Sequence, residues 1–351
     1  MVRKIKVACI GLGHMGKLHM MNVRFIDGVE LTAAADQSKS ALKKAESIGF
    51  KHLFSDYREV FGSVDIDAAI VCLPNFLHKD CVTLAAEHGI DVFLEKPLAH
   101  NVDDGREIIK KVKKYGIKLM IGYNYRFFDC VEELKRKLDM GFVGEIEIAT
   151  LELILNGPFS PYLTPRPVPE WWFSADRIGG GPLFESGDHL VDLFRWFFGE
   201  PIKVLYACLD NHYNLPYEDT AITILRSDKT STKGVINVGW FSRSIFPTFN
   251  FRVILHGTNN FVSTDLLIPR NLYLHAAKEA IKNIFRKITG RKIRPLTYTY
   301  YYSSYIKEML HFFEAVRNDT EHMCTAEEGL RIIEILEECY RIAVSLNHGG
   351  E

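Results

Sequence analysis

The sequence predicts an α/β domain with a doubly wound parallel sheet, followed by an α+β domain. In the first third of the chain, short apolar segments alternate with helix-like segments, and a glycine-rich turn follows the first apolar segment. Further along, strand-like segments of alternating polarity gather together instead of alternating with helices. We therefore predict two domains, residues 1–124 and residues 125–351.

Composition narrows the class of protein. The chain has 351 residues, of which 47% are hydrophobic and 25% charged, as in an ordinary globular protein. Its formal net charge of −1 provides no global attraction for nucleic acid, so we predict no such partner. The seven cysteines include no C-x-x-C pair and are interpreted as reduced thiols. With no apolar run long enough to cross a bilayer, we predict a cytoplasmic protein.

The first predicted strand, residues 5–10, leads directly into Gly11-Leu12-Gly13-His14-Met15-Gly16 and then into a helix that ends near residue 25. This is a G-x-G-x-x-G pattern in a strand–turn–helix context. Its glycines allow a tight turn and close approach of a pyrophosphate, whose charge is stabilised by the amino end of the helix. We therefore predict that this turn, with His14 and Met15, binds a dinucleotide.

A second strand, residues 30–35, ends in Asp36, about 20 residues after the last glycine. A carboxylate at this position can accept hydrogen bonds from both ribose hydroxyls and repels a 2′-phosphate. The next positions, Gln37 and Ser38, supply no arginine for such a phosphate, which favours NAD over NADP. Lys39 is a nearby cation and keeps this preference moderate. We predict NAD as the cofactor and regard NADP as the weaker candidate.

The alternation of strands and helices continues to about residue 122. The predicted strands are residues 67–73, 91–94 and 118–122, and the predicted helices are residues 76–88 and 102–115. Leu73-Pro74-Asn75 follows one of these strands and is expected near the nicotinamide, but an ordinary turn explains it equally well.

Residues 91–94 form a buried strand that ends abruptly in Glu95-Lys96-Pro97. Open parallel sheets bind ligands beyond the carboxyl ends of their strands, so Lys96 is expected to project toward cofactor and substrate. From this stretch alone, a surface lysine in a loop is an equal alternative.

Strand-like segments of the second domain span residues 145–155, 204–209, 220–225, 234–241 and 249–255. Between them, a glycine turn precedes a predicted helix on which Glu185, His189 and Asp192 share one face. Histidine titrates near neutral pH and suits a general base, but a structural histidine paired with a neighbouring carboxylate is also possible. A metal site lacks a fourth ligand at a suitable spacing, so we predict none.

Several motifs together resemble the glucose-fructose oxidoreductase and inositol dehydrogenase family of NAD(P)-dependent oxidoreductases. They are Gly11 to Gly16 with His19, Leu73-Pro74-Asn75 with His78, Glu95-Lys96-Pro97, Tyr123 to Phe127, Gly141 to Ile146, and Gly179-Gly180-Gly181 leading to His189. The resemblance covers most of the chain to about residue 200 and implies a Rossmann domain followed by a domain with a large, mostly antiparallel open sheet.

The resemblance also implies roles for individual residues. His78 and Glu95 join the cofactor site, Lys96 contacts the reacting hydroxyl, and a histidine on a helix of the second domain, here His189, is the acid/base. One face of the open sheet commonly forms the oligomer interface, so we expect a homodimer or homotetramer. Whether the Lys96–Pro97 bond is cis stays open.

Two positions depart from the family pattern. Glu185 replaces the usual aspartate four residues before the histidine, and Asp188 replaces an apolar residue. Glu185 is long enough to reach the substrate or Lys96, which makes it the third catalytic candidate. For Asp188 we weigh a substrate contact against a solvated helix face and favour the latter.

Further candidates for substrate contacts are aromatic or cationic. Tyr123, Arg126 and Arg166 suit carbohydrate hydroxyls or a phosphate. Trp171 and Trp172 suit stacking on a sugar ring, although packing in the interior is the commoner fate of such a pair.

Residues 276–294 form a basic amphipathic segment with one apolar stripe. We favour a docked surface helix with a solvated charged face over contact with an anionic membrane. A strand over residues 297–302 and closing helices over residues 304–316 and 326–346 complete the chain.

The sequence thus predicts an NAD-dependent dehydrogenase that acts on a secondary hydroxyl of a sugar, sugar derivative or cyclic polyol. A nucleotide- or sugar-sensing protein without turnover is the alternative from another class, and an imine or enone reductase is a third. Because Lys96 and His189 are both present, we favour the dehydrogenase.

Overall fold

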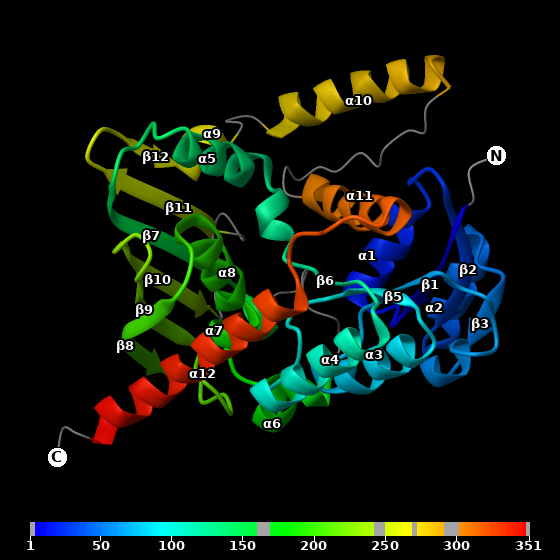
Figure 1. Ribbon diagram of the computed structural model, residues 1–351, viewed down its shortest axis with the longest axis horizontal. Coiled ribbons are helices and arrows are strands. Elements are labelled where there is room, and N and C mark those ends of the chain that lie inside the picture. Colours follow the sequence, from blue (N-terminus) through cyan, green and yellow to red (C-terminus); the bar gives the residue numbers. More distant parts are fainter. Residues whose placement is uncertain (1–3, 160–168, 242–249, 269–271, 291–301, 349–351) are drawn as a thin grey trace. The chain divides into compact units, whose positions relative to one another are not determined.

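The computed structural model describes residues 4–159, 169–241, 250–268, 272–290 and 302–348, and it contains two compact units (Figure 1). The first unit comprises Met1–Leu98, Asp103–Phe128 and Pro269–Ala326, and the second comprises Ala99–Val102, Asp129–Ile268 and Glu327–Glu351. The predicted boundary after residue 124 separates the two sheets. The chain returns to the first unit near its end, with the segment Pro269–Ala326.

The sheet of the first unit, here sheet A, is entirely parallel and has the order β3-β2-β1-β4-β5-β6. Its strands are β1 (Ile5–Ile10), β2 (Val29–Ala35), β3 (His52–Phe54), β4 (Ala68–Val71), β5 (Asp91–Leu94) and β6 (Leu119–Ile121). The strand order reverses between β1 and β4, and such a reversal is where doubly wound sheets bind nucleotides. The predicted α/β fold class is confirmed.

Helices connect these strands, as the alternation predicts. They are α1 (His14–Val23), α2 (Lys39–Ile48), α3 (His78–Glu87) and α4 (Val102–Tyr115), with the short 3₁₀ turns η1 (Tyr57–Val60), η2 (Asn75–Leu77) and η3 (Asn124–Phe127). Local signals define the ends of α2: the Ser38 side chain accepts a hydrogen bond from Ala41 N, and Gly49 ends the helix with φ +115°.

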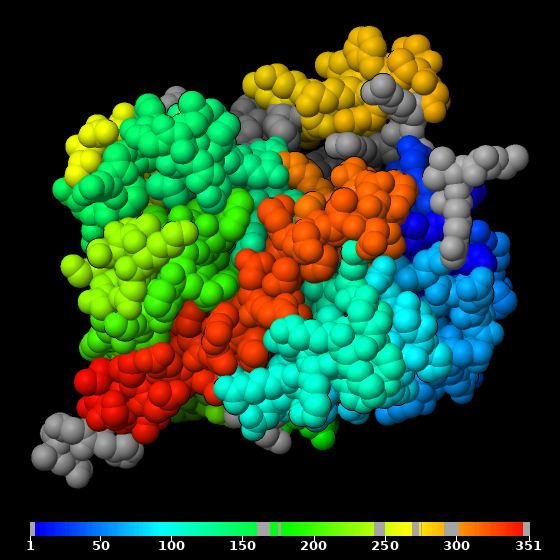
Figure 2. Space-filling view, viewed as in Figure 1, coloured from blue at the N-terminus to red at the C-terminus, as the bar shows by residue number. Residues whose placement is uncertain are grey.

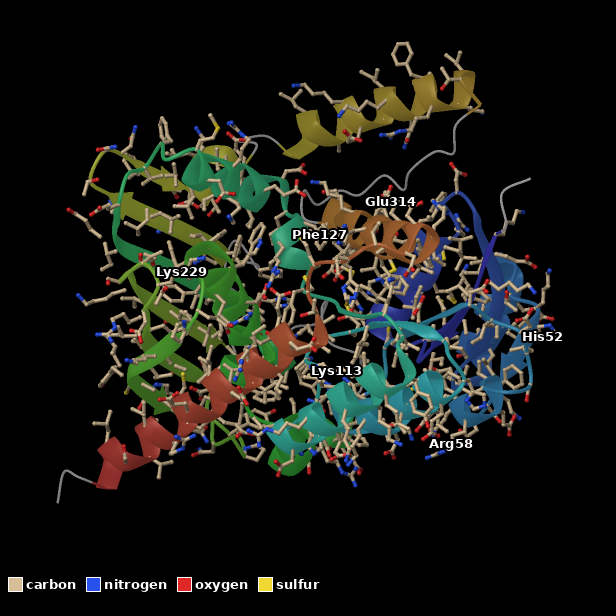
Figure 3. All side chains as sticks on the ribbon, in the orientation of Figure 1. His52, Arg58, Lys113, Phe127, Lys229 and Glu314 are labelled. Carbon is tan, nitrogen blue, oxygen red and sulfur yellow. The ribbon has the colours of Figure 1, made fainter. Side chains whose placement is uncertain are left out.

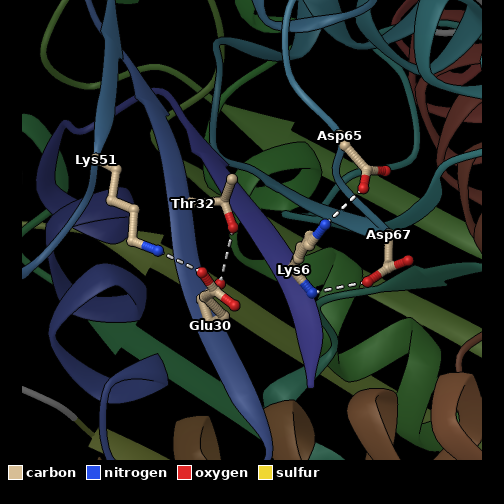
Figure 4. A network of polar contacts seen from close by, with 6 residues as sticks. All are labelled: Lys6, Glu30, Thr32, Lys51, Asp65 and Asp67. Carbon is tan, nitrogen blue, oxygen red and sulfur yellow. Dashed lines mark hydrogen bonds and ion pairs between the residues drawn. The ribbon is translucent and has the colours of Figure 1, made fainter. Parts of the chain in front are cut away.

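Charged side chains line the early part of β1 and β2, away from their carboxyl ends (Figure 4). Lys6 Nζ lies 2.5 Å from Asp65 Oδ2, and Lys6 N donates to Asp67 Oδ2 at 2.8 Å. Lys51 Nζ makes a similar contact of 2.5 Å with Glu30 Oε1. These ion pairs are largely exposed, so each contributes little to the stability of the fold. The predicted site residues lie at the other edge of sheet A, at the carboxyl ends of its strands.

A helix from near the end of the chain completes the first unit. Helix α11 (Ser303–Asn318) packs against α1 and η3, and the Phe312 ring meets the Phe93 ring of β5 with centroids 5.9 Å apart. Figure 3 labels Phe127 on η3 and Glu314 on α11, and Phe127 lies 5.8 Å from His311 between ring centroids. The burial of one face of α11 explains why the chain returns to this unit.

The sheet of the second unit, here sheet B, has the order β12-β11-β7-β10-β9-β8. Its strands are β7 (Ile146–Leu155), β8 (Ile202–Asp210), β9 (Thr220–Ser227), β10 (Lys233–Trp240), β11 (Asn250–Gly257) and β12 (Phe261–Ser263). All neighbouring pairs are antiparallel except β10 with β7. This confirms the mostly antiparallel sheet that the family resemblance implies.

Helix α8 (Gly187–Phe198) packs against β7 and β10, and nearly all of its side chains are buried. Gly234 of β10 makes this approach possible, because a Cβ there would lie 2.4 Å from the Phe194 ring. The single helix predicted after the glycine turn is wrong: α7 (Pro182–Glu185) is followed by Ser186, whose φ of −124° breaks the helix before α8 begins. The other helical segments of this unit are α5 (Asp129–Asp139), η4 (Gly157–Phe159), η5 (Glu170–Phe173), α6 (Ala175–Ile178), α9 (Thr264–Leu267) and α12 (Ala326–His348).

Helix α10 (Leu272–Ile288) differs from the docked helix that we favour from the sequence. A docked amphipathic helix buries its apolar stripe, but Ile281, Phe285 and Ile288 are 53%, 63% and 74% exposed. Figure 2 shows the atoms of this segment at the surface, in gold. Within the described residues, no helix combines the length and the apolar character needed to cross a lipid bilayer. The predicted strand over residues 297–302 lies, except for Tyr302, outside the described residues.

Candidate active site

The glycine turn after β1 is tightly packed on one side and open on the other. Gly11 has φ +79°, and a Cβ there would lie 2.6 Å from the Cys72 carbonyl oxygen. A Cβ on Gly16 would lie 1.7 Å from the Gly11 carbonyl oxygen. At Gly13, by contrast, no described atom lies within 4 Å of the Cβ position. The open space beside Gly13, at the amino end of α1, suits a pyrophosphate that approaches the backbone.

Asp36 lies at the end of β2, where the sequence predicts the ribose contact. Its Oδ2 accepts from Leu12 N at 2.6 Å, and its Oδ1 accepts from Ser38 N at 2.7 Å. These two bonds tie the carboxylate to the glycine turn. Each oxygen keeps a further lone pair, so the partly exposed carboxylate can still accept from ribose hydroxyls.

His78 joins the loops that follow β4 and β5. Its Nε2 lies 2.9 Å from the Leu73 carbonyl oxygen, and its Nδ1 lies 2.9 Å from the Pro97 carbonyl oxygen. Burial lowers the pKa of His78, and the two carbonyl oxygens oppose this only in part. A neutral ring has one N–H and donates to one carbonyl at a time. The contacts described for His78 are thus with the backbone, beside the predicted cofactor residues Leu73, Pro74 and Asn75.

The Glu95-Lys96-Pro97 stretch is held on both sides of the lysine. Glu95 Oε1 lies 2.5 Å from Nε2 of His19, which is fully buried on α1. On the other side, Pro97 contacts His78, and the Lys96–Pro97 peptide bond is cis. Lys96 itself is half-buried. These contacts fix the backbone that carries the Lys96 ammonium at the carboxyl end of β5.

Two side chains of α11, the half-buried Tyr305 and the fully buried Glu308, belong to this region and were not predicted from the sequence. Tyr305 packs edge-on against the His19 ring, with centroids 5.9 Å apart. Burial, reinforced by the negative charge of Glu95, raises the pKa of Glu308 well above its usual range. Among the described residues, neither carboxyl oxygen of Glu308 has a hydrogen-bond partner. In the sequence, Glu308 is merely one acidic residue in an amphipathic pattern, so nothing there signals a buried carboxyl.

Tyr123 and Arg126 follow β6, the strand beside β5. Gly122 N donates to the Leu94 carbonyl oxygen at 2.8 Å, which places Tyr123 at the same edge of sheet A as Lys96. Tyr123 is fully buried and Arg126 is 2% exposed. Their turn, η3, is fastened to α11 by a hydrogen bond of 3.0 Å from Asn124 Nδ2 to Ser304 Oγ. The first unit therefore brings together the glycine turn, Lys96 and these two substrate candidates along one edge of sheet A.

The second unit contains the predicted general base. His189 lies in the first turn of α8 and is 7% exposed, and Asp192 on the same helix is 1% exposed. Asp188 is fully buried, and its Oδ1 accepts from His189 N at 2.8 Å, so the favoured solvated helix face is wrong. Glu185 ends α7, where its Oε2 accepts from Ser186 Oγ at 3.3 Å. The break at Ser186 removes the regular helical spacing on which a shared face with His189 was predicted.

Glu218 organises the turn that leads into these helices, and no sequence signal singled it out. Its carboxylate accepts from Gly181 N and Leu183 N, each at 3.0 Å, and from the Tyr340 hydroxyl at 2.8 Å. Gly181 is required here, because a Cβ would lie 1.9 Å from the Glu218 carbonyl oxygen. Burial raises the pKa of Glu218, while these hydrogen bonds oppose the rise. Glu218 therefore stabilises the amino end of α7, which precedes the His189 helix.

The tryptophan pair packs into an aromatic cluster. Trp171 and Trp172 are half-buried, and the Trp172 ring lies 6.1 Å from the Trp240 ring between centroids. Tyr217 extends the cluster and donates from its hydroxyl to the Trp172 carbonyl oxygen at 2.6 Å. Packing thus accounts for part of the pair's surface and leaves part exposed. Arg166 lies outside the described residues.

All seven cysteines are free thiols. In the part of the chain that the structure describes, no three His, Cys, Asp or Glu side chains are grouped in a way that could hold a metal ion.

Comparison with known proteins agrees with the fold and with the glycine turn. Residues 5–123 match the family model described as "Oxidoreductase family, NAD-binding Rossmann fold", and residues 138–345 match "Oxidoreductase family, C-terminal alpha/beta domain". Myo-inositol 2-dehydrogenase of Thermotoga maritima is 25% identical over 331 residues, which cover 93% of this chain and 92% of that protein.

Solved structures with the same fold include two dehydrogenases determined with a bound nicotinamide cofactor. Scyllo-inositol dehydrogenase of Lactobacillus casei, with bound NAD(H) and scyllo-inositol, superposes with a TM-score of 0.76 at 20% identity, covering 96% of this chain and 97% of that chain. The WlbA dehydrogenase of Bordetella pertussis, in complex with NADH and UDP-GlcNAcA, superposes with a TM-score of 0.78 at 22% identity, covering 98% and 97%.

The geometry at the carboxyl edge of sheet A fits a dinucleotide: the space beside Gly13 suits its pyrophosphate, and Asp36 suits its ribose. Both halves of the family model match in order along the chain. The protein belongs to the Gfo/Idh/MocA family of oxidoreductases, and its first domain is that family's NAD-binding Rossmann domain.

Proposed function

We propose that the protein is a dehydrogenase that uses NAD to oxidise a secondary hydroxyl of a sugar, a sugar derivative such as a nucleotide-sugar, or a cyclic polyol. The observation that carries this proposal is the position of Lys96. It is a half-buried cation directly after β5, at the sheet edge that also carries the glycine turn. The named relatives, which act on inositols or are solved with a sugar nucleotide, support this class of substrate.

In this proposal, Lys96 donates a hydrogen bond to the hydroxyl oxygen and stabilises the negative charge that develops there. His189 accepts the hydroxyl proton as the C–H bond breaks and the carbonyl forms. When bound, NAD supplies the acceptor for the hydride. Glu185 is proposed to help orient the substrate or Lys96, and Asp36 to select NAD by accepting from the ribose hydroxyls.

Several further side chains are proposed to contact the substrate. They are Tyr123, Arg126, Arg166, Trp171, Trp172 and Asp188. Arginine and tyrosine offer donors for carbohydrate hydroxyls, and a tryptophan face offers stacking on a sugar ring.

We also propose that the open face of sheet B pairs with a second copy of the chain, giving a homodimer or homotetramer. Along β9, Ala221, Thr223 and Leu225 are buried, while Ile222 on the other face is 48% exposed. On the neighbouring strand β8, Tyr206 is 40% exposed. Sedimentation equilibrium tests this assembly, and a monomer at all concentrations would overturn it.

Turnover is tested by adding NAD to a panel of inositols, sugars and nucleotide-sugars and following the absorbance of the reduced cofactor. With the best substrate, His189→Ala is expected to lower kcat by about 10²- to 10⁴-fold while NAD binding persists. Lys96→Ala is expected to lower kcat/KM by a comparable factor. Matched controls are His88→Ala and Lys113→Ala, which change exposed side chains and are expected to keep full activity.

Full turnover by either Lys96→Ala or His189→Ala would overturn the assigned roles. NAD binding without turnover on any member of the panel would favour a sensor in place of an enzyme.

A further inference from the structure

Helix α10 presents its apolar side outward. Leu274, Ile281, Phe285 and Ile288 lie within about 60° of one another around the helix axis. Their exposed fractions are 63%, 53%, 63% and 74%. The opposite side carries Ala276, Ala280 and Asn283, which are half-buried, and also Lys287, which is exposed. The small and polar side of the helix is therefore the more buried one, which is the reverse of a helix docked by its apolar stripe.

Positive charge borders the exposed stripe. Lys278 and Lys282 lie along one side of it, and both are exposed. Residues 276–294 contain seven Lys or Arg side chains against the single acidic residue Glu279, which forms an ion pair with Lys282. An apolar stripe with a basic border suits a surface whose outer layer is negatively charged and whose inner layer is apolar.

We propose that α10 is a membrane-surface helix that binds an anionic lipid bilayer. The helix has 17 residues and is about 26 Å long, which suits a position parallel to the bilayer plane. Leu274, Ile281, Phe285 and Ile288 enter the boundary between headgroups and acyl chains. Lys278 and Lys282 extend their aliphatic stems along that boundary and place their ammonium groups against lipid phosphates.

Charge favours this occupant over a second copy of the chain. In an antiparallel two-fold pairing of two α10 stripes, the lysine-bearing side of one helix lies beside that of the other. That arrangement places lysines beside lysines and is opposed by like-charge repulsion. Anionic headgroups instead neutralise these side chains. A neutral bilayer offers the apolar layer without the charge, so the preference for anionic lipid is the distinguishing property.

The test is flotation of the full-length protein with vesicles. One set contains phosphatidylcholine alone, and the other contains equal parts of phosphatidylcholine and phosphatidylglycerol. The protein is expected to float with the anionic vesicles at low salt, to float much less with the neutral ones, and to be released as salt is raised.

Two double variants with matched controls separate the contributions. Ile281→Ser with Phe285→Ser is expected to weaken binding about tenfold or more, because both apolar side chains leave the bilayer. The control is Val344→Ser with Leu346→Ser on α12, whose side chains are 56% and 50% exposed. Lys278→Glu with Lys282→Glu is expected to abolish the preference for anionic lipid, and Lys113→Glu with Lys114→Glu on α4 is the matched control. NAD reduction by all four variants in the absence of lipid is expected to equal that of the natural chain.

Three outcomes would overturn the proposal. They are no flotation with anionic vesicles at low salt, equal flotation of the Ile281/Phe285 variant, or equal flotation of the Lys278/Lys282 variant. A concentration-dependent oligomer that Ile281→Ser with Phe285→Ser reduces in size, with no vesicle binding, would assign the stripe to a second copy.

Discussion

Gly13 and Gly16 lie in one turn but have different surroundings, so the same substitution is expected to act differently at each. Gly13→Ala adds a Cβ in open space, but Gly13 is the N-cap of α1, where glycine is preferred to alanine, so stability is expected to fall by about 0.5–1 kcal/mol. The added methyl occupies the approach of the pyrophosphate and is expected to weaken NAD binding about tenfold or more. Gly16→Ala forces the Gly11 carbonyl to move and is expected to cost about 1–3 kcal/mol of unfolding free energy.

Urea unfolding and NAD titration of the two variants check this difference. Equal losses of stability, or unchanged NAD affinity for Gly13→Ala, would show that the space beside Gly13 is not the pyrophosphate position.

Glu308 is expected to make stability depend on pH. Its pKa in the folded chain is raised above its unfolded value, so the folded state retains a proton that the unfolded state has lost. Unfolding free energy therefore falls as pH rises above about 4.3, by up to about 1.4 kcal/mol for each pH unit until the folded pKa is reached. Glu308→Gln cannot ionise, so its stability is expected to fall less steeply with pH than that of the natural chain.

Urea unfolding at a series of pH values measures this slope, and Glu314→Gln on the same helix is the control. Glu314 is exposed (Figure 3), so this change is expected to leave the slope as it was. Parallel slopes for the natural chain and Glu308→Gln would mean that the buried carboxyl is not protonated in the folded state.

Candidate positions at strand ends have a signal in the sequence that burial of helix residues lacks. Gly11, Asp36 and Lys96 each follow a predicted strand, and the carboxyl ends of parallel strands converge on one edge. Asp188 and Glu308 instead lie on helices, where polarity alone does not say which face is covered. Burial of both depends on segments distant in sequence, which no local pattern reveals.

At the level of elements, Glu218 is expected to hold α7 in place. Glu218→Ala leaves Gly181 N and Leu183 N without their acceptor and is expected to cost about 1–3 kcal/mol of unfolding free energy. Tyr340→Phe removes one hydrogen bond to the same carboxylate and is expected to cost about 0.5–1.5 kcal/mol. Because both changes remove the Tyr340–Glu218 contact, the double variant is expected to lose less than the two single losses together. Strict additivity in urea unfolding would contradict this shared network.

Elements with a strong period were predicted within a few residues, and short or interrupted ones were not. The predicted helix over residues 102–115 coincides with α4, and all five predicted strands of the second domain have counterparts in sheet B. Strands β3 and β12 have three residues each, too few to establish an alternation, and neither was predicted. The break at Ser186 was also missed, although Gly187 follows it directly, because Glu218 anchors α7 from a distant strand–strand loop.

At the scale of the whole molecule, the amphipathic pattern of the sequence predicted helix α11 but did not indicate which unit the helix packs against. The stripe of Ile306, Met309 and Phe313 requires a covering surface, and either unit could supply one. Contacts with α1, β5 and η3 place α11 in the first unit, about 200 residues after the sheet it covers. A prediction with one domain boundary does not describe a chain whose later segment packs again on its first unit.

The return has a consequence for cofactor binding that hydrogen exchange can measure. NAD binds the folded state and stabilises it by about 2.7 kcal/mol at a concentration about 100 times its Kd. Because α11 packs on α1 and shares a buried cluster with His19 and Glu95, we expect slower exchange in Ser303–Asn318 as well as in α1. Strands β8 and β9 of the second unit serve as the internal control and are expected to change less. If exchange in α11 followed these strands and not α1, α11 would belong energetically to the second unit despite its contacts in the first.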